Sequence, residues 1–371
     1  MNDITIDKTG WKKWRFDEVC RQVNTSSNDP VADGLDHVIG LEHIEPGNLH
    51  ITKWDTLEKE TTFTRKFVKG QVLFGRRRAY KRKVAYAEFD GICSGDILVF
   101  EAIEENLLPE LLPFLIQSDG FFEKALATSA GSLSPRTKFK ELADYEFLLP
   151  PKSEQKRLAE LLWAADEMIE KEKRELEKVK HLRELRFENI TSQIANAKLA
   201  DCLIVLKSKS KAPHLYDKYI GLEHIESGAF TTNIFGDPKN VLADSFIFKQ
   251  GDLLYSKLRP YLDKCIIADF DGISTTELIV YDTTPIVSKE YILHVLHSKR
   301  FLDYIVDKSF GTKMPRVSHE IVSEYELYVP SPEKQEAILK EINAFVSQEI
   351  NIAKQISYSR QLKQKLINKI F

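Results

Sequence analysis

The chain has 371 residues, 43% of them hydrophobic and 10% aromatic, which is enough for two or three ordinary domains and excludes a disordered protein. Its net charge of −3 provides no bulk attraction for phosphate, so a nucleic-acid binder of this composition needs local basic patches. The sequence has no signal-like or membrane-length apolar run and no Cys-x-x-Cys pair. We therefore expect a cytoplasmic protein with free thiols and no metal site.

Residues 1–151 are predicted to form a mixed α+β domain. Short apolar runs at 72–74, 84–86 and 97–100 indicate strands separated by glycine-containing turns. Between about Pro109 and Ala127 the apolar residues recur at helical spacing, which predicts one helix.

Two basic segments of this domain are candidate DNA contacts. Residues 76–83 mix Arg, Lys and Tyr between two predicted strands, and residues 131–138 form a small, hydroxyl-rich basic loop. Such loops supply phosphate contacts and fork-shaped donors for guanine edges. The alternatives are a solvated hairpin for the first segment and a plain turn for the second. The candidate residues are Arg76, Arg77, Arg78, Lys81, Arg82, Lys83, Arg136 and Lys138.

Residues 152–197 are predicted to form one long helix. Pro150 and Pro151 break the preceding chain, Ser153 offers an N-cap, and no proline or glycine follows until Pro213. Apolar residues recur mostly every three or four positions, while charged residues fill the other faces.

Residues 198–331 repeat the first domain. The heptapeptide Ile-Gly-Leu-Glu-His-Ile-Glu at 39–45 recurs letter for letter at 220–226, and the same offset carries Tyr80 to Tyr261. A repeat this long indicates a duplicated domain rather than a solenoid of short units. Its histidines, His43 and His224, sit in an apolar frame that is more typical of core residues than of ligands. The candidate DNA contacts of this copy are Lys257, Arg259, Lys264, Lys313 and Arg316.

Residues 332–371 carry a second long apolar stripe, which follows Pro330-Ser331-Pro332. Helices of about forty residues are about 60 Å long and cannot bury such a stripe inside a small domain, so each needs a partner of similar length. The predicted fold is therefore α+β. It has two duplicated mixed α/β globular domains, separated by two long helices that pair as an antiparallel coiled coil.

Motifs for catalysis are missing from the sequence. It contains no Asn/Asp-Pro-Pro-Tyr/Phe motif, no G-x-x-x-x-G-K-[ST] phosphate loop and no H-E-x-x-H. The Glu-x-Lys at 154–156 lies at a helix start, away from any plausible nuclease strand. We expect no catalytic residue and no cofactor or metal bound by this chain.

The junctions between domains and helices carry a family resemblance. Residues 148–156 (Leu-Leu-Pro-Pro-Lys-Ser-Glu-Gln-Lys) and 328–336 (Tyr-Val-Pro-Ser-Pro-Glu-Lys-Gln-Glu) each precede a long helix. Together with residues 10–14 and 256–261 they resemble the specificity subunit of type I restriction-modification systems. The order of domain, helix, domain, helix over the whole chain is also similar to that family. The first copy departs from the Lys-Leu-Arg-Pro-Tyr pattern at 77–80.

The resemblance implies a DNA-recognition protein without catalytic activity. Each globular domain would read one half of a split, asymmetric site in double-stranded DNA. The helices would separate the two readers and dock two modification (methyltransferase) subunits, with a restriction subunit (endonuclease and translocase) joining them. S-adenosylmethionine and ATP would belong to those partners. No membrane association is implied.

Two other classes of protein are compatible with the sequence. One is the recognition portion of a fused methyltransferase or nuclease, and the other is a coiled-coil scaffold whose heads bind protein. DNA binding that weakens with salt separates the DNA-binding classes from the scaffold, because only phosphate contacts release counterions.

Overall fold

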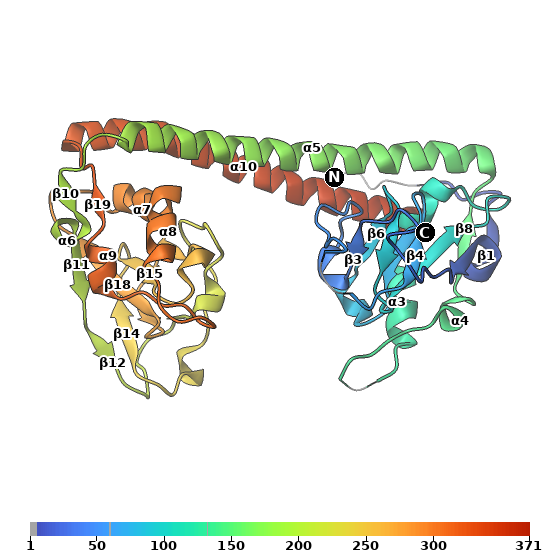
Figure 1. The fold of residues 1–371 in the computed structure, drawn as a ribbon, viewed down its shortest axis with the longest axis horizontal. Coiled ribbons are helices and arrows are strands. Elements are labelled where there is room, and N and C mark those ends of the chain that lie inside the picture. The colour runs from blue at the N-terminus through green and yellow to red at the C-terminus, as the bar shows by residue number, and fades with distance from the viewer. Residues whose placement is uncertain (1–5, 59–60, 132) are drawn as a thin grey trace. The chain divides into compact units, whose positions relative to one another are not determined.

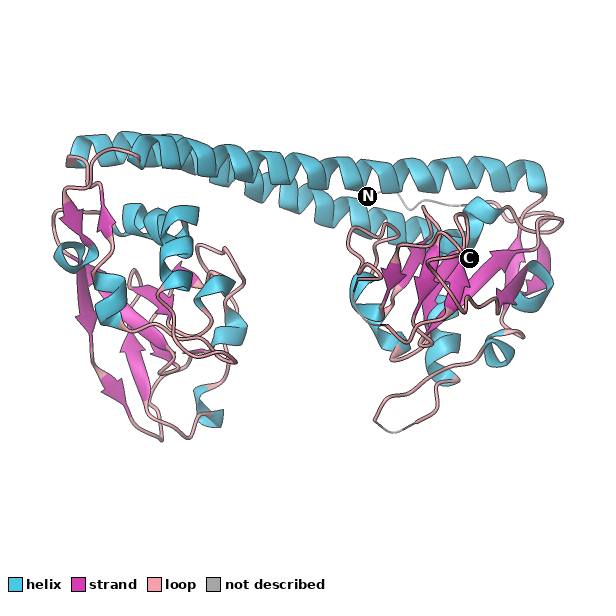
Figure 2. Ribbon diagram, viewed as in Figure 1, coloured by secondary structure: helices cyan, strands magenta, loops and turns pink. Residues whose placement is uncertain are grey.

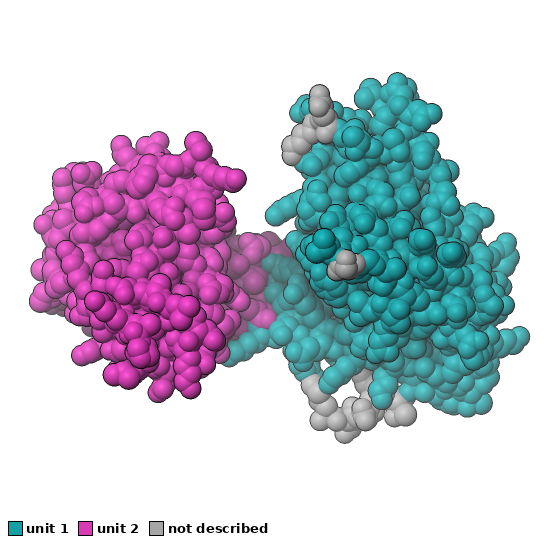
Figure 3. All heavy atoms as spheres, turned by 90° about the horizontal axis from the view of Figure 1, so that it is seen from below, with its two compact units in different colours: residues 1–173, 354–371 teal, residues 174–353 magenta. Residues whose placement is uncertain are grey.

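The computed structural model describes residues 6–58, 61–131 and 133–371, so Ser132 of the second basic segment lies outside the described residues. The chain forms two compact units, residues 1–173 with 354–371 and residues 174–353 (Figure 3). Each unit contains one copy of the repeated domain and a stretch of both long helices. Among the described residues, no helix has the length and apolar character needed to cross a membrane.

Two larger sheets, of four and three strands, form most of the globular part of the first unit (Figure 2). The four-stranded sheet is antiparallel, and in the three-stranded sheet the outer strand β3 runs parallel to β7. In spatial order, the strands are β2 (Cys20–Val23), β8 (Ile97–Ala102), β5 (Val72–Gly75) and β6 (Val84–Tyr86) in one sheet, and β3 (Val38–Ile39), β7 (Gly91–Cys93) and β4 (Arg65–Phe67) in the other.

Strand β5 in the four-stranded sheet is buried on both faces. Val72 and Phe74 of β5 belong to the core cluster that includes the helices, whereas Leu73 between them belongs to a second cluster with the other sheet. This division follows from the alternation of side chains along a strand. It also explains why the sequence of β5 is apolar throughout rather than alternating.

The helix predicted over 109–127 is interrupted. The structure has the 3₁₀ helix η3 (Pro109–Leu111), then α2 (Leu112–Gln117) and α3 (Asp119–Ala127). Ser118 separates α2 from α3 with extended backbone (φ −64°, ψ 150°), and its hydroxyl accepts a hydrogen bond from the Phe121 amide as an N-cap. A serine cap competes with helix continuation at little cost, which the apolar periodicity alone does not reveal.

The second unit repeats this architecture. Ser298 separates the first two of the helices named next, in the same way that Ser118 separates α2 from α3 in the first unit. The helices are α7 (Lys289–His297), α8 (Lys299–Asp307) and α9 (His319–Ser323). The strands, in spatial order, are β11 (Leu203–Leu206), β18 (Leu278–Thr283), β15 (Leu253–Ser256) and β16 (Cys265–Ile267), then β12 (Lys209–Ser210), β14 (Ser245–Phe248), β17 (Gly272–Ser274) and β13 (Tyr219–Ile220).

Short elements complete both copies. A two-stranded antiparallel ladder closes each domain next to its long helix, β1 (Lys12–Arg15) with β9 (Glu146–Leu149) and β10 (Ala197–Lys198) with β19 (Glu326–Leu327). The remaining short helices are α1 (Phe16–Val19), α4 (Phe139–Leu142), α6 (Leu199–Cys202), η1 (Leu41–His43), η4 (Leu222–His224) and η5 (Pro238–Asn240). All four cysteines are buried and unpaired.

The long helices are α5 (Lys152–Thr191) and α10 (Pro332–Ile370) (Figure 1). The first ends six residues before the predicted end at 197. The Asn196 side chain exchanges two hydrogen bonds with the Val329 backbone (2.8 and 2.9 Å), and Ala197 pairs with Leu327 in a strand. Tertiary strand pairing therefore replaces the last predicted helical turns.

The two helices contact each other in antiparallel order within each unit. In the first unit, Ser359 Oγ donates to Glu172 Oε1 at 3.2 Å. In the second unit, Arg183 Nε donates to Glu349 Oε1 at 2.6 Å, and Arg186 pairs with Glu341. Early residues of α5 thus meet late residues of α10 and the reverse, which confirms the predicted α+β fold with an antiparallel helix pair.

A buried glutamine attaches each domain to its helix. The Gln155 side chain donates to Asn106 O and Pro150 O, both at 3.0 Å, and accepts from the Leu108 amide at 2.9 Å. Gln335 bonds in the same way to Ile286 O, Pro330 O and the Ser288 amide, each at 2.9 Å. The repeated Pro-to-Gln spacing is therefore a joint between domain and helix, because it satisfies backbone groups that would otherwise be buried without partners.

A buried charge cluster joins the first domain to both helices. Asp166 of α5 contacts His50 Nε2 at 2.9 Å and Lys363 Nζ of α10 at 2.5 Å, and its side chain is only 4% exposed. The hydrogen bond that His50 donates to Asp166 raises the pKa of His50 to about 9, and Glu88 adds to this effect. Burial opposes ionisation of Asp166, but its bonds to His50 and Lys363 outweigh burial and lower its pKa.

Candidate nucleic-acid interface

The loop between β5 and β6 has an unusual backbone that is the same in both copies. Its 3₁₀ helix η2 (Ala79–Lys81) is flanked by Arg78 (φ 53°) and Arg82 (φ 50°), both left-handed. In the second copy, η6 (Pro260–Leu262) lies between Arg259 (φ 51°) and Asp263 (φ 49°). Left-handed geometry costs a non-glycine residue about 1–2 kcal/mol. Its presence in both copies therefore marks a loop whose shape is held by its surroundings.

The two predicted basic segments of each domain come together. In the first copy, the Arg78 amide donates to Pro135 O (2.8 Å) and the Thr137 amide donates to Arg76 O (3.2 Å). The equivalent bonds of the second copy run from Arg259 to Pro315 O (2.7 Å) and from Val317 to Lys257 O (2.9 Å). Two loops about sixty residues apart in sequence therefore form one continuous basic surface in each domain.

An acidic residue at the start of β8 or β18 neutralises part of this surface. Asp96 accepts from Arg136 Nε at 2.7 Å and from Arg77 Nη1 at 3.3 Å, and the bond from Arg136 does most to lower the pKa of Asp96. In the second copy, Glu277 accepts from Arg316 Nε at 3.3 Å. Arg77, Arg136 and Arg316 therefore have internal partners that fix the two loops against each other.

Three further predicted cations support the loop from within. Lys83 Nζ donates to Leu41 O, and Lys264 Nζ donates to Leu222 O, both at 2.6 Å. Arg82 pairs with Asp119 at 2.5 Å and lies over the Phe122 ring at 4.4 Å. These side chains use their donors inside the domain, so they hold the loop in place.

The repeated heptapeptide now has a structural explanation. His43 Nδ1 accepts from the Gly40 amide at 3.0 Å, and His224 Nδ1 accepts from the Gly221 amide at 2.9 Å. Each histidine thus closes the turn whose carbonyl, Leu41 O or Leu222 O, holds the lysine of the basic loop. The segment supports the loop from below and is not itself part of the basic surface.

Seven of the thirteen predicted cations have no side-chain hydrogen bond or ion pair with any described residue. In addition, the Nε atoms of Arg76 and Arg259 are buried without a partner, and burial, together with Arg65 and Arg136, lowers the pKa of Arg76. Buried donors without a partner are rare in folded proteins, so these two Nε atoms are unusual features of the basic loops. The seven residues are Arg76, Arg78, Lys81, Lys138, Lys257, Arg259 and Lys313.

The structure adds two residues that the charge pattern missed. Tyr80 and Tyr261, at equivalent positions of η2 and η6, are 55% and 52% exposed in the middle of the basic loops. Their identity in the two copies was the available signal in the sequence.

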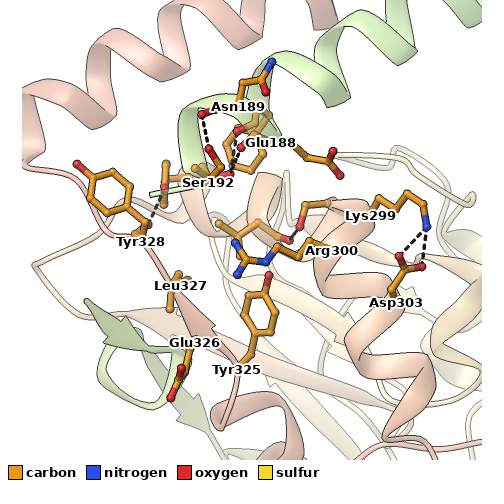
Figure 4. Close-up of a pocket in the computed structure, with 15 residues that line it drawn as sticks. Glu188, Asn189, Ser192, Lys299, Arg300, Asp303, Tyr325, Glu326, Leu327 and Tyr328 are labelled. Carbon is orange, nitrogen blue, oxygen red and sulfur yellow. Dashed lines mark hydrogen bonds and ion pairs between the residues drawn. The ribbon is translucent and has the colours of Figure 1, made fainter. Parts of the chain in front are cut away.

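Two of the concave surfaces in the second unit differ in their relation to the basic loops. A groove of about 490 Å³ runs beside the basic loops and is lined by Lys257, Arg316, Phe246 and Phe310, among others. A second cavity of about 500 Å³ lies where the end of α5 meets α8 and β19, and Figure 4 shows Arg300 and Tyr325 in its wall. None of the predicted cations lines that second cavity, so it is not part of the basic surface.

One group among the described residues has the composition of a metal site. Possible ligand atoms of Glu42, His43 and Asp55 lie within 4.8 Å of one another. The His43 Nδ1 atom already accepts a backbone hydrogen bond, and the second copy has Gly236 at the position equivalent to Asp55. The group is therefore not a shared feature of the two domains.

Duplicated α+β domains attached to an antiparallel helix pair define this class of protein. A family model described as the type I restriction modification DNA specificity domain matches residues 9–181 and 209–359, and the chain belongs to that family. The predicted family is confirmed. Because the family is the non-catalytic specificity component, family membership also confirms the prediction that this chain is not an enzyme.

Individual relatives agree with this placement. The chain is 23% identical over 330 residues to the EcoDI type I restriction enzyme specificity subunit of Escherichia coli, covering 73% of each protein. A chain solved in a study of complex assembly and conformational transition of the type I R-M system has a TM-score of 0.56, with 17% identity and 97% of both chains covered. The S subunit of M. genitalium gives 0.52, with 15% identity over 98% of this chain and 96% of that one. These structures support the fold.

Proposed function

We propose that this chain is the sequence-specific DNA-recognition subunit of a type I restriction-modification complex. Two recognition domains, residues 1–151 and 198–331, each read one part of a split, asymmetric site in double-stranded DNA. The observation that carries the proposal is the joining of two basic loops into one surface, by the same backbone hydrogen bonds, in both copies.

The charge distribution supports DNA as the ligand. A chain with a net charge of −3 places unpaired cations on the two matched loops. Arg and Lys in such loops neutralise phosphates, and free guanidinium groups match the acceptors of guanine in the major groove. Of the thirteen predicted residues, we assign DNA contact to the seven without internal partners and loop support to the other six.

The helices α5 and α10, residues 152–191 and 332–370, separate the two readers and dock two modification subunits. A restriction subunit binds the assembled complex. S-adenosylmethionine and ATP are used by those subunits, and this chain determines the DNA sequence to which the complex binds.

The test is to express the chain with its modification subunit and map methylated sites by modification-aware sequencing. A split motif is expected, and exchange of residues 1–151 for another recognition domain should change one half of it only. A change of both halves would contradict the two-reader proposal. DNA binding that does not weaken with salt would favour protein-binding heads instead.

A further inference from the structure

The duplication provides an internal comparison that separates two kinds of DNA contact. This inference rests on the proposed function, in which two similar domains read different halves of one site. Both halves offer the same sugar-phosphate backbone but different base edges. Exposed residues that are identical in the two copies therefore suit the backbone, and exposed residues that differ suit the bases.

The unpaired residues shared by the copies are few. Arg78 and Arg259 occupy the same left-handed position, and neither guanidinium pairs with any described residue. Two residues further on, Tyr80 and Tyr261 are 55% and 52% exposed, and neither ring stacks on a described aromatic residue. We name these four residues the shared contacts.

The backbone around the shared contacts is held at a cost. Both arginines keep positive φ values, 53° and 51°, although neither is glycine or asparagine. The Arg78 and Arg259 backbone amides donate hydrogen bonds to the Pro135 and Pro315 carbonyls, at 2.8 and 2.7 Å, and these bonds hold the arginines in that conformation. Strain kept in both copies is expected where it aims a side chain at a ligand.

The groove beside the second loop shows the opposite behaviour. Phe310 lies at its edge with 57% of its surface exposed, and Phe246 forms part of its wall. The residue equivalent to Phe310 is Ala130, because the bridges Ala130–Arg136 and Phe310–Arg316 match. The residue equivalent to Phe246 is Arg65, because β4 pairs with β7 in the same register as β14 pairs with β17. In that copy Arg65 donates to Gly95 O at 3.3 Å. The aromatic groove is thus a feature of the second domain.

Lys257 and Arg316 line the same groove together with Glu277, the partner of Arg316, so Lys257 is the unpaired cation beside the aromatic surface. A double helix presents this combination in reverse, with anionic phosphates next to the one apolar group of the major groove, the thymine methyl. Exposed phenylalanine beside an unpaired lysine therefore fits a thymine edge better than a guanine or cytosine edge.

We propose that Arg78, Tyr80, Arg259 and Tyr261 bind the sugar-phosphate backbone at equivalent places in both half-sites, and that Phe310 recognises a thymine methyl group in the second half-site alone. The two domains then differ in sequence specificity because the residues beside their basic loops differ. The shared contacts supply affinity for DNA of any sequence.

The first experiment measures the shared contacts in the complex with the modification subunit. R78Q and R259Q should each weaken binding to the target duplex and to a scrambled duplex by the same factor, about tenfold, as for loss of one charged hydrogen bond. The slope of log affinity against log salt should fall by about one unit, with the methylated motif unchanged. The conservative R78K should keep the slope, and K12Q, an exposed lysine on β1, serves as the charge-matched control.

The second experiment removes single methyl groups from the DNA. Each thymine of the second half-site is replaced in turn by uracil, which deletes only the 5-methyl group. At one position, the wild-type complex should lose about fourfold in affinity, the value of one buried methyl group. F310A introduces the residue of the first copy and should be insensitive to the same replacement.

The outcomes distinguish a failure of the proposed function from a failure of the assigned DNA contacts. If the wild-type complex does not bind DNA in a salt-dependent manner, the proposed function fails. If it binds, but R78Q or R259Q changes the methylated motif, the shared contacts read bases and the inference is wrong. Equal responses of the wild type and F310A to every uracil would remove Phe310 as the thymine reader. Thermal melting and co-purification with the modification subunit verify that each variant is folded.

Discussion

Replacement of Asp166 by asparagine should destabilise the first unit strongly. The carboxylate is 4% exposed and bonds to both His50 and Lys363, whose side chains are 21% and 5% exposed. Asparagine has a similar shape but no charge, so the Lys363 ammonium remains buried without a counterion. Breaking one side of a buried ion pair costs about 3–5 kcal/mol. Because His50 retains access to solvent and to Glu88, we expect about 3 kcal/mol.

The assay is denaturant unfolding followed by tryptophan fluorescence. All four tryptophans, at positions 11, 14, 54 and 163, belong to the first unit, so the signal reports that unit alone. The matched control is E88Q, which removes the other partner of His50, a carboxylate with 46% exposure. Its loss should cost less than about 1 kcal/mol. Equal midpoints for D166N and E88Q would refute the argument that the cluster is a buried joint.

The same cluster predicts a pH dependence of definite sign. The pKa of His50 is raised from 6.5 to about 9, so its contribution to stability is complete below pH 6.5 and is lost as the pH rises through about 9. After allowance for solvent screening the contribution is about 2 kcal/mol. The difference in stability between the wild type and H50Q should shrink between pH 6.5 and 10, and a constant difference would show that the histidine is not charged in the folded protein.

Three other outcomes are expected. Insertion of four residues near Lys178 lengthens α5 by about 6 Å and should favour a DNA spacer that is longer by one or two base pairs, with some loss of stability. The spacer is read from the methylated motif. An unchanged spacer at full activity would limit the helices to docking. K83M removes the bond to Leu41 O and should lower the stability of the first unit by about 1 kcal/mol, measured by tryptophan fluorescence. Burial raises the pKa of all four thiols, that of Cys93 to about 12, so a thiol reagent at pH 8 should modify the unfolded chain and leave the folded one almost unreacted.

The large features of the fold could be predicted because they depend on local pattern. The repeat, the two long helices and their antiparallel pairing follow from the spacing of apolar residues and the need to bury two matching stripes. The end of α5 could not be predicted, since it depends on Asn196 meeting the backbone of Val329, more than a hundred residues away. The interruption at Ser118 is a competition between cap and helix that periodicity does not settle.

The sequence predicts which loops of each domain are basic, but not which of their cations have partners inside the domain. Charge patterns located both basic loops of each domain, but they did not show that Asp96 and Glu277 neutralise Arg136 and Arg316. Lys83 lies in the same basic run as the residues assigned to DNA contact, and its charge alone does not distinguish it from them. Its hydrogen bond to Leu41 O shows that its side chain holds the loop in place. Whether a cation has an internal partner depends on residues that are distant in sequence but close in space. A single sequence does not show which residues are close in space.

The division of the chain into units has a consequence for its synthesis. Residues 174–353 form the second unit from one continuous segment, whereas the first unit also requires residues 354–371. Leu366, Ile367 and Ile370 belong to the same core cluster as Trp11. A ribosome therefore completes the second unit while the first, although made earlier, still lacks part of its core. Chains released early by a late stop codon would therefore expose that apolar surface to proteases and chaperones.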